Sequence, residues 1–183
     1  MKERWTTCGL LVVALVALAP HRTLTASTSS ATEYEVKAAF LYSFAKYVEW
    51  PDGAVTEEPF LIGVLGQDPF EQALDVTLQG KSILGHRVAV ARFARLDEAL
   101  RSHILFVAGS DAREQDPVLK ALQGRPILSA GESEGFAERG GIVGFRTQDN
   151  RVRFEINLRR AEESGLKISS QLLKLATIVT TKP

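Results

Sequence analysis

The sequence predicts an α/β fold, a single domain built on a mixed, mostly parallel sheet of about six strands with helices on both faces. Apolar runs of strand length alternate with segments in which apolar residues recur every three or four positions. The chain then finishes with a β-hairpin and a helical segment. Residues 27–183 contain no linker or change of composition that would divide them, which predicts one domain.

The first periodic segment is predicted to be a helix over residues 34–50. Its apolar residues recur at gaps of three and four and give it a wide apolar face. Pro51 predicts the end of the helix, because the residue before a proline avoids the helical region. Residues 26–32 are small and polar and are expected to form a flexible lead. The large side chains that this helix carries are Phe40, Tyr42, Phe44, Tyr47 and Trp50.

A central strand is predicted at residues 60–65 (FLIGVL). The run is continuously apolar, as expected of a parallel strand that is buried on both faces. Asp68 and Pro69 then favour the start of a helix, as its cap and first residue. The further elements predicted in order are a helix at 68–78, a strand at 88–93, a helix at 96–101, a strand at 103–107, a helix at 110–122, a strand at 126–129 and a helical turn at 136–139.

The last third of the chain has a different pattern. In residues 152–158 apolar and polar residues alternate, which predicts an antiparallel hairpin with the segment at 142–146 across a polar turn at 148–150. Residues 158–179 are predicted to form a final helix, or two helices, because Gly165 interrupts the pattern and Ser169 or Ser170 could cap a restart.

Charge and composition exclude several classes of function. The chain has 22 Lys and Arg against 22 Asp and Glu, so a basic nucleic-acid-binding protein is not expected. Its single cysteine, Cys8, excludes an intrachain disulfide and a thiolate zinc site. His86 and His103 do not have metal-ligand spacing, and no GxSxG motif is present. We therefore expect no catalytic residues, no metal site and no cofactor, and a protein that is not an enzyme.

The N-terminal residues have the pattern of a secretory signal peptide. Lys2 and Arg4 precede an apolar run at residues 10–19, and small and polar residues follow. The apolar run is about half of the roughly 20 residues that span a bilayer. The pattern predicts a signal peptide over 1–26, with cleavage after Ala26 or as late as Ala31, and a mature domain over 27–183. We expect an exported chain with no direct membrane insertion after cleavage.

Three turns that follow strands form an alternative, ligand-binding hypothesis. If these strands are parallel, their turns lie at the carboxyl edge of the sheet, where open α/β sheets bind ligands. The simpler interpretation, which we favour, is that the polar residues only cap helices. The candidate ligand-binding residues are Gln67, Asp68, Ser110, Asp111 and Glu132.

Several stretches together resemble the YfiR-like family of small exported bacterial proteins, over about residues 33–179. The first and last stretches are the most specific. The stretches are AAFLYSFAKYVEWP (38–51), LIGVLGQDPF (61–70), HILFVAG (103–109), GGIVGF (140–145) and RFEINLRRAEESGLKISSQLLKLA (153–176).

The resemblance implies a periplasmic α/β protein that self-associates, here expected as a homodimer. The best-understood family member is a repressor that binds the periplasmic sensor region of an inner-membrane diguanylate cyclase. It thereby lowers cyclic-di-GMP output and biofilm formation. Our first hypothesis is accordingly a periplasmic regulatory binding protein, our second a small-ligand-binding module, and our third and weakest an enzyme.

The resemblance also directs attention to possible partner-binding residues, because aromatic side chains are favoured anchors at interfaces. The aromatic residues of the 34–50 helix are candidates, together with Leu172, Leu173 and Ile178 near the C-terminus. The competing interpretation is that the aromatic residues belong to the core.

One position departs from the family pattern. Family members often have a cysteine just before the histidine of HILF, and this chain has Ser102 there. Redox sensing through disulfides therefore cannot be carried over to this chain.

Overall fold

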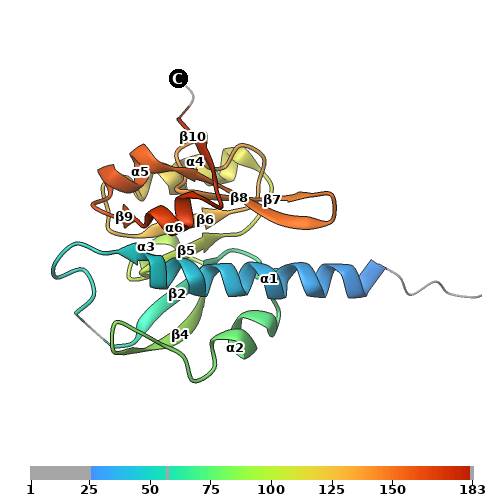
Figure 1. The fold of residues 1–183 in the computed structure, drawn as a ribbon, viewed down its shortest axis with the longest axis horizontal. Helices are drawn as coiled ribbons and strands as arrows, with labels where there is room; N and C mark the ends of the chain where they lie inside the picture. The colour runs from blue at the N-terminus through green and yellow to red at the C-terminus, as the bar shows by residue number, and fades with distance from the viewer. Residues whose placement is uncertain (1–25, 57, 182–183) are drawn as a thin grey trace, which may run out of the picture.

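The computed structural model describes residues 26–56 and 58–181 (Figure 1). Eight strands form one sheet in the order β10-β8-β7-β6-β5-β2-β4-β3, and β1 pairs with β9 in a separate two-stranded sheet. The strands are β1 (Val48–Glu49), β2 (Phe60–Leu65), β3 (Ser82–Ile83), β4 (His86–Phe93), β5 (Ile104–Val107), β6 (Leu128–Gly131), β7 (Val143–Gln148), β8 (Arg151–Asn157), β9 (Lys167–Ile168) and β10 (Thr177–Val179). The helices are α1 (Ala26–Tyr47), α2 (Ala73–Leu78), α3 (Leu96–Ala99), α4 (Ala112–Ala121), α5 (Leu158–Glu163) and α6 (Ser170–Leu173).

The centre of the large sheet is parallel. Strands β4, β2, β5, β6 and β7 run in one direction, and β8 turns back against β7 through the hairpin. Strand β2 lies between β4 and β5, and its residues Ile62, Gly63 and Val64 are buried. This confirms the predicted mixed, mostly parallel α/β fold, and the sheet has more strands than the six expected.

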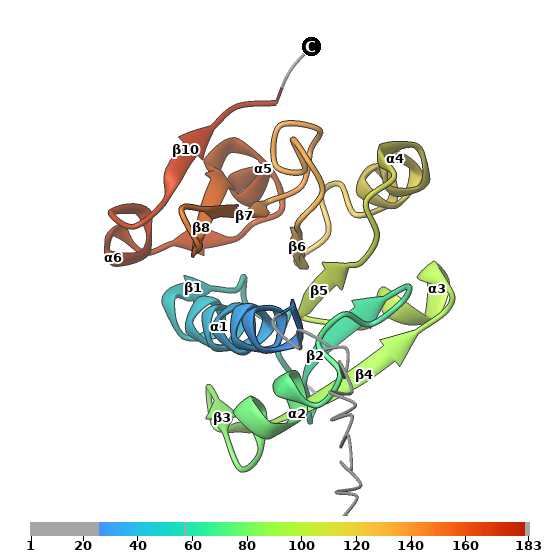
Figure 2. The same cartoon turned by 90° about the vertical axis from the view of Figure 1, so that its right-hand side faces the viewer.

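Helices cover both faces of the sheet, as predicted. Helix α1 crosses one face of the sheet, with α2 and α6 on either side of it, whereas α3 and α4 lie on the other face (Figures 1 and 2). The larger core lies under α1 and extends from α2 to α6. The smaller core includes Ala99 of α3, Leu119 of α4 and Phe136.

An aromatic cluster attaches α1 to the hairpin strands. The ring of Phe44 lies 5.8 Å from that of Phe145 on β7 and 5.1 Å from that of Phe154 on β8, between centroids. Phe40 lies 5.1 Å from Phe154. Aromatic pairs at these distances contribute about 0.5–1.5 kcal/mol each beyond the area they bury. The first helix is therefore held by residues more than 100 positions later in the chain.

The boundaries of two helices, α1 and α2, differ from the predictions. Helix α1 begins at Ala26, because extending an existing helix by a further residue costs far less than starting one. It ends at Tyr47, because Val48 and Glu49 pair with Ile168 and Lys167. Helix α2 begins only at Ala73, since Glu71 has a positive φ of 51° that a helix cannot contain.

A single helix over 158–179 is wrong, whereas the alternative of two helices is confirmed by α5 and α6 and is wrong only beyond Leu173. Gly165 has a φ of +74° and ends α5, and the chain then forms β9. Ser169 caps a short restart, α6, by accepting a hydrogen bond from the backbone N–H of Leu172, as one of the two predicted serines. Thr177–Val179 forms the edge strand β10, which pairs in parallel with β8.

Candidate functional site

The three turns of the ligand-binding hypothesis lie at one edge of the sheet. Strands β2, β5 and β6 are neighbours and parallel, so the turns that follow them lie at the same carboxyl edge. Two of the predicted ligand-binding residues accept hydrogen bonds from nearby backbone N–H groups. Asp68 accepts a hydrogen bond of 2.8 Å from the N–H of Phe70, and Asp111 caps α4 by accepting one of 2.8 Å from the N–H of Arg113. Gln67 and Ser110 are exposed.

Asp68 also takes part in an ion-pair network. Its second carboxylate oxygen accepts a hydrogen bond of 2.8 Å from Nε of Arg92 on β4, and Arg92 also pairs with Asp75 of α2. Arg92 holds the pKa of the Asp75 carboxyl below its ordinary value. This network attaches the end of β4 to the segment after β2.

Glu132, the fifth predicted residue, is paired with a buried lysine of α1. Lys37 is 2% exposed, and its ammonium group lies 2.6 Å from Glu33 and in contact with Glu132. The hydroxyl of Tyr34 donates a hydrogen bond of 3.0 Å to Glu132. Burial and the negative charge of Glu132 raise the pKa of Tyr34. Below, these four residues are called the Lys37 cluster.

A pocket of about 410 Å³ opens beside the Lys37 cluster, and Arg146 and Thr147 of β7 also line it. Four of its charged groups, those of Glu33, Lys37, Glu132 and Arg146, already have partners within the protein. Thr147 donates a hydrogen bond to Glu33, and Arg146 forms an ion pair of 2.7 Å with Glu155 on the neighbouring strand. An ionic ligand would therefore have to compete with these internal pairs.

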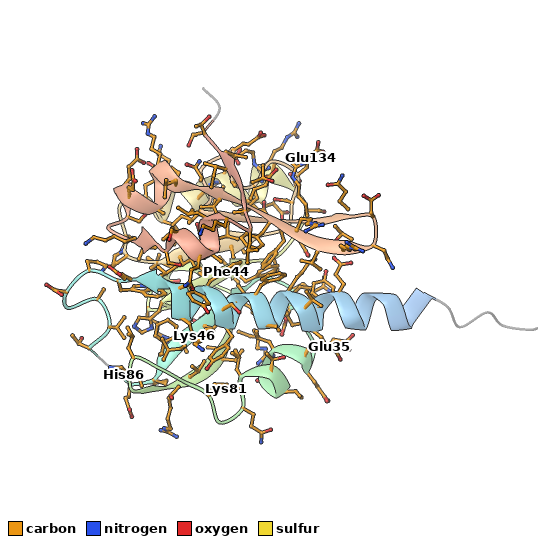
Figure 3. All side chains as sticks on the ribbon, in the orientation of Figure 1. Glu35, Phe44, Lys46, Lys81, His86 and Glu134 are labelled. Atoms are coloured by element: carbon orange, nitrogen blue, oxygen red, sulfur yellow. The ribbon has the colours of Figure 1, made fainter. Side chains whose placement is uncertain are left out.

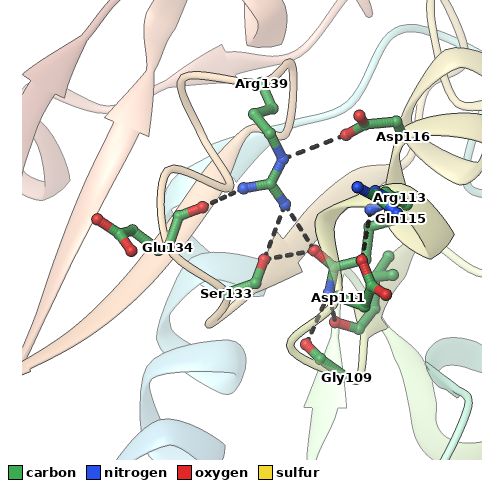
Figure 4. A network of polar contacts seen from close by, with 9 residues as sticks. Gly109, Asp111, Arg113, Gln115, Asp116, Ser133, Glu134 and Arg139 are labelled. Atoms are coloured by element: carbon green, nitrogen blue, oxygen red, sulfur yellow. Dashed lines mark hydrogen bonds and ion pairs between the residues drawn. The ribbon is translucent and has the colours of Figure 1, made fainter.

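A second cluster at the carboxyl edge was not predicted from the sequence. Arg139 donates hydrogen bonds to Gln115 Oε1 (2.7 Å) and Ser133 Oγ (2.9 Å), and it pairs with Asp116 at 3.2 Å (Figure 4). Gln115 and Ser133 are buried and bonded to each other, and the Gln115 amide donates to the carbonyl of Gly109. The cluster joins α4 to the turns after β5 and β6.

No local sequence signal identifies the Arg139 cluster, because its members come from separate elements. The only indication is the predicted helical turn at 136–139, which places an arginine near the end of β6. Within the described ranges, no three His, Cys, Asp or Glu side chains gather closely enough to hold a metal ion. The carboxyl edge is thus an assembly of internal ion pairs and caps.

His103 has a structural role. Its Nδ1 accepts a hydrogen bond of 2.9 Å from the N–H of Leu61, which joins the starts of β5 and β2. Its ring stacks on Phe60 with 4.6 Å between centroids.

The partner-binding candidates separate into core and surface residues. Phe44 and Leu172 are 0% and 3% exposed, so their assignment to partner binding is corrected to the core. Phe40 is half-buried against Phe154, and Trp50 packs its ring on Phe60.

Tyr42 and Phe44 lie on different sides of α1. The ammonium groups of Lys46 and Lys81 lie 5.7 Å and 5.8 Å from the centre of the Tyr42 ring. Figure 3 shows both lysines on the side of α1 away from Phe44. The Tyr42 side of the helix is therefore partly covered by lysine side chains.

On the other side, the end of α1 meets α6. The backbone N–H of Ser169 donates a hydrogen bond of 3.0 Å to the carbonyl of Tyr47, immediately beside the β1–β9 pair. Tyr47 is 41% exposed, Leu173 is half-buried, and Leu175, just after α6, is 68% exposed. We call Tyr47, Leu173 and Leu175 the α1–α6 surface. It brings together two segments that the sequence suggested separately.

Among residues 26–56 and 58–181, no helix has both the length and the apolar character needed to cross a bilayer. The predicted signal peptide over 1–26 lies almost wholly outside the described residues. In a comparison with known protein families, the YfiR/HmsC-like profile matches residues 34–177. That range extends from α1 to the first residue of β10 and so includes both helices of the α1–α6 surface. The match spans most of the chain, and the protein therefore belongs to the YfiR/HmsC-like family.

Proposed function

We propose that this protein is a periplasmic regulatory binding protein. It inhibits a membrane-bound signalling enzyme, such as a diguanylate cyclase, by contacting that enzyme's periplasmic domain through the α1–α6 surface. Membership of the YfiR/HmsC-like family supports a regulatory role. The observation that carries the proposal is that two distant segments, the end of α1 and the start of α6, are joined by backbone hydrogen bonds and carry apolar side chains there. Tyr47 and Leu175 are exposed, and Leu173 is half-buried.

The α1–α6 surface has the composition of an interaction site. A tyrosine and two leucines supply apolar area, which contributes about 25 cal/mol per Å² when it is removed from water. The β1–β9 pair and the hydrogen bond to the Tyr47 carbonyl fix α1 relative to α6. A surface that is ordered in advance loses less conformational entropy on binding.

Inhibition follows if the surface binds the inactive state of the partner more tightly than the active state. Shifting a two-state partner from 1:99 to 99:1 requires about 10⁴-fold preference, or about 5.5 kcal/mol. A few well-packed aromatic and aliphatic contacts can supply a difference of this size, since single hot-spot residues contribute about 2 kcal/mol or more.

The test is a double variant, Tyr47→Ser with Leu173→Ser, expressed with its native leader and captured from cross-linked cells. The matched control is Val76→Ser on α2, which removes an apolar side chain that is 68% exposed elsewhere on the molecule. We expect the double variant to lose co-purification with a membrane signalling protein and to raise cellular cyclic-di-GMP, whereas the control behaves as wild type. Equal capture by all three proteins would contradict the proposal.

Self-association is a distinct outcome on the same surface. Sedimentation of the purified double variant shows whether it changes oligomeric state. If the variant becomes monomeric but still captures the membrane protein, the surface serves the proposed homodimer and the partner binds elsewhere.

A further inference from the structure

A second pocket lies at the opposite, amino edge of the parallel strands. It has a volume of about 270 Å³ and is formed where β5 and β6 begin. The residues that matter for its chemistry are Arg101, Ser102, His103, Arg125 and Ile127. We call it the amino-edge pocket.

Buried residues form the rigid part of this pocket. Ser102, His103 and Ile127 are 3%, 8% and 4% exposed. The His103 ring is fixed by its hydrogen bond from Leu61 and its stacking on Phe60. The N–H of Leu128 donates to the carbonyl of His103, which keeps the two strand starts together.

Two arginines from different elements line the same pocket. Arg101 follows α3, and its guanidinium lies 5.3 Å from the centre of the Phe93 ring. Arg125 follows α4, and its Nε donates a hydrogen bond of 3.0 Å to the carbonyl of Ala121. These contacts orient each guanidinium and leave the terminal N–H groups of both for another acceptor.

The described residues that line the amino-edge pocket carry no negative charge, since no Asp or Glu is among them. In residues 26–56 and 58–181, no carboxylate forms an ion pair with either arginine, whereas six other arginines are paired: Arg92, Arg95, Arg139, Arg146, Arg159 and Arg160. Two unpaired cations that face one cavity repel each other, and a bound anion would remove that repulsion.

We propose that the amino-edge pocket binds a small oxyanion, a phosphate group in particular. Guanidinium groups present paired N–H donors that match the oxygen atoms of phosphate. A tetrahedral phosphate offers oxygens in several directions and so meets arginines from two different elements at once. The pocket is at the edge opposite the three turns considered above and is separate from the α1–α6 surface.

The test measures binding of inorganic phosphate to the purified protein by NMR titration and by thermal shift, against chloride at equal ionic strength. The variant is Arg101→Ala with Arg125→Ala. The matched control is Arg87→Ala with Arg113→Ala, which removes two exposed arginines outside the pocket. We expect phosphate to shift the amide signals of residues 101–103 and of Arg125 and Ile127 in wild type and control. The pocket variant should bind at least about tenfold more weakly.

Three results would overturn the proposal. Wild-type protein could show no phosphate binding, the pocket and control variants could lose the same affinity, or acetate could bind as tightly as phosphate. Unchanged thermal stability of the pocket variant without phosphate confirms that any lost binding is not a loss of fold.

Discussion

The arginines at the two edges of the parallel sheet differ in whether they pair with carboxylates. At the carboxyl edge, Arg92 and Arg139 are held by carboxylates, and Lys37 lies between two glutamates. At the amino edge, Arg101 and Arg125 line a pocket that has no carboxylate among its described residues. The carboxyl edge is where ligands are expected in open α/β sheets, and here it is filled by internal ion pairs. Position in a fold therefore suggests a site, but the partners of its side chains decide whether a ligand can use it.

The largest expected effect is that of Lys37→Met at the carboxyl edge. The substitution leaves Glu33 and Glu132 close together without their shared cation, and we expect a loss of about 2–3 kcal/mol in the free energy of unfolding. This expected loss is smaller than is usual when one partner of a fully buried ion pair is removed, because both carboxylates are partly exposed to solvent. Urea unfolding measures the loss. A change below about 0.5 kcal/mol would contradict the view that this edge is held by its ion pairs.

The next comparison sets Arg139→Ala against Arg101→Ala. Removing Arg139 leaves the buried polar atoms of Gln115 and Ser133 with fewer partners, which should cost about 2 kcal/mol. Arg101 has no carboxylate to lose, so we expect its removal to change stability by less than about 0.5 kcal/mol. Urea unfolding of the two variants and the wild type measures both changes in the free energy of unfolding. Equal losses would mean that the two edges do not differ in this way.

A smaller effect concerns pH. Burial acts to raise the pKa of Glu33, but hydrogen bonds from Lys37 and Thr147 and the charge of Lys37 outweigh it and hold the pKa below its ordinary value of 4.5. The unfolded chain thus takes up a proton at this position before the folded chain does. The stability that Glu33 contributes is present above about pH 4.5 and is lost as the pH falls through the folded value.

We therefore expect wild-type protein to lose stability between about pH 5 and pH 3 more steeply than Glu33→Gln, by about 1 kcal/mol or less. Thermal unfolding across this range provides the measurement. Parallel curves for the two proteins would show that the Glu33 carboxylate does not contribute.

A small effect of opposite sign is expected at the amino edge, from Ser102→Ala. The Ser102 hydroxyl is buried with no hydrogen-bond partner in the described part of the chain, and an added Cβ at Gly63 would lie 2.3 Å from it. A buried unpaired hydroxyl is unfavourable, so alanine should stabilise the protein by about 0.5–1 kcal/mol. A loss of stability would indicate a partner for this hydroxyl. The position is one where relatives often have cysteine, a less polar residue.

The sequence predicts the long elements of this fold because their patterns are strong. The apolar run of β2 and the alternation in β8 give each strand its correct place, and Asp149 and Asn150 take the positive φ angles expected of a tight turn. The two-residue strands β1, β3 and β9 are too short to show any period. Strand β10 was missed because Leu172 and Leu175 continue a helical spacing up to Thr177.

The site was less accessible to prediction, for a physical reason. Tyr47 and Leu173 could be proposed as surface residues from their type, but only the fold brings them together. Phe44 and Leu172 are buried, whereas Tyr47 and Leu173, which are close to them in the sequence, are not fully buried. The Arg139 cluster and the amino-edge pocket depend on contacts between separate elements, which spacing along the chain does not reveal.

The position of α1 has a consequence for how the chain folds. Its rings pack on Phe145 and Phe154, and its last residue is bonded to Ser169, so the first helix completes its contacts only with the last part of the chain. Such long sequence separations slow folding, because a large loop must close before the contacts form. A nascent chain would keep Phe40 and Phe44 uncovered until synthesis is nearly complete, which is compatible with the export that we propose for this protein.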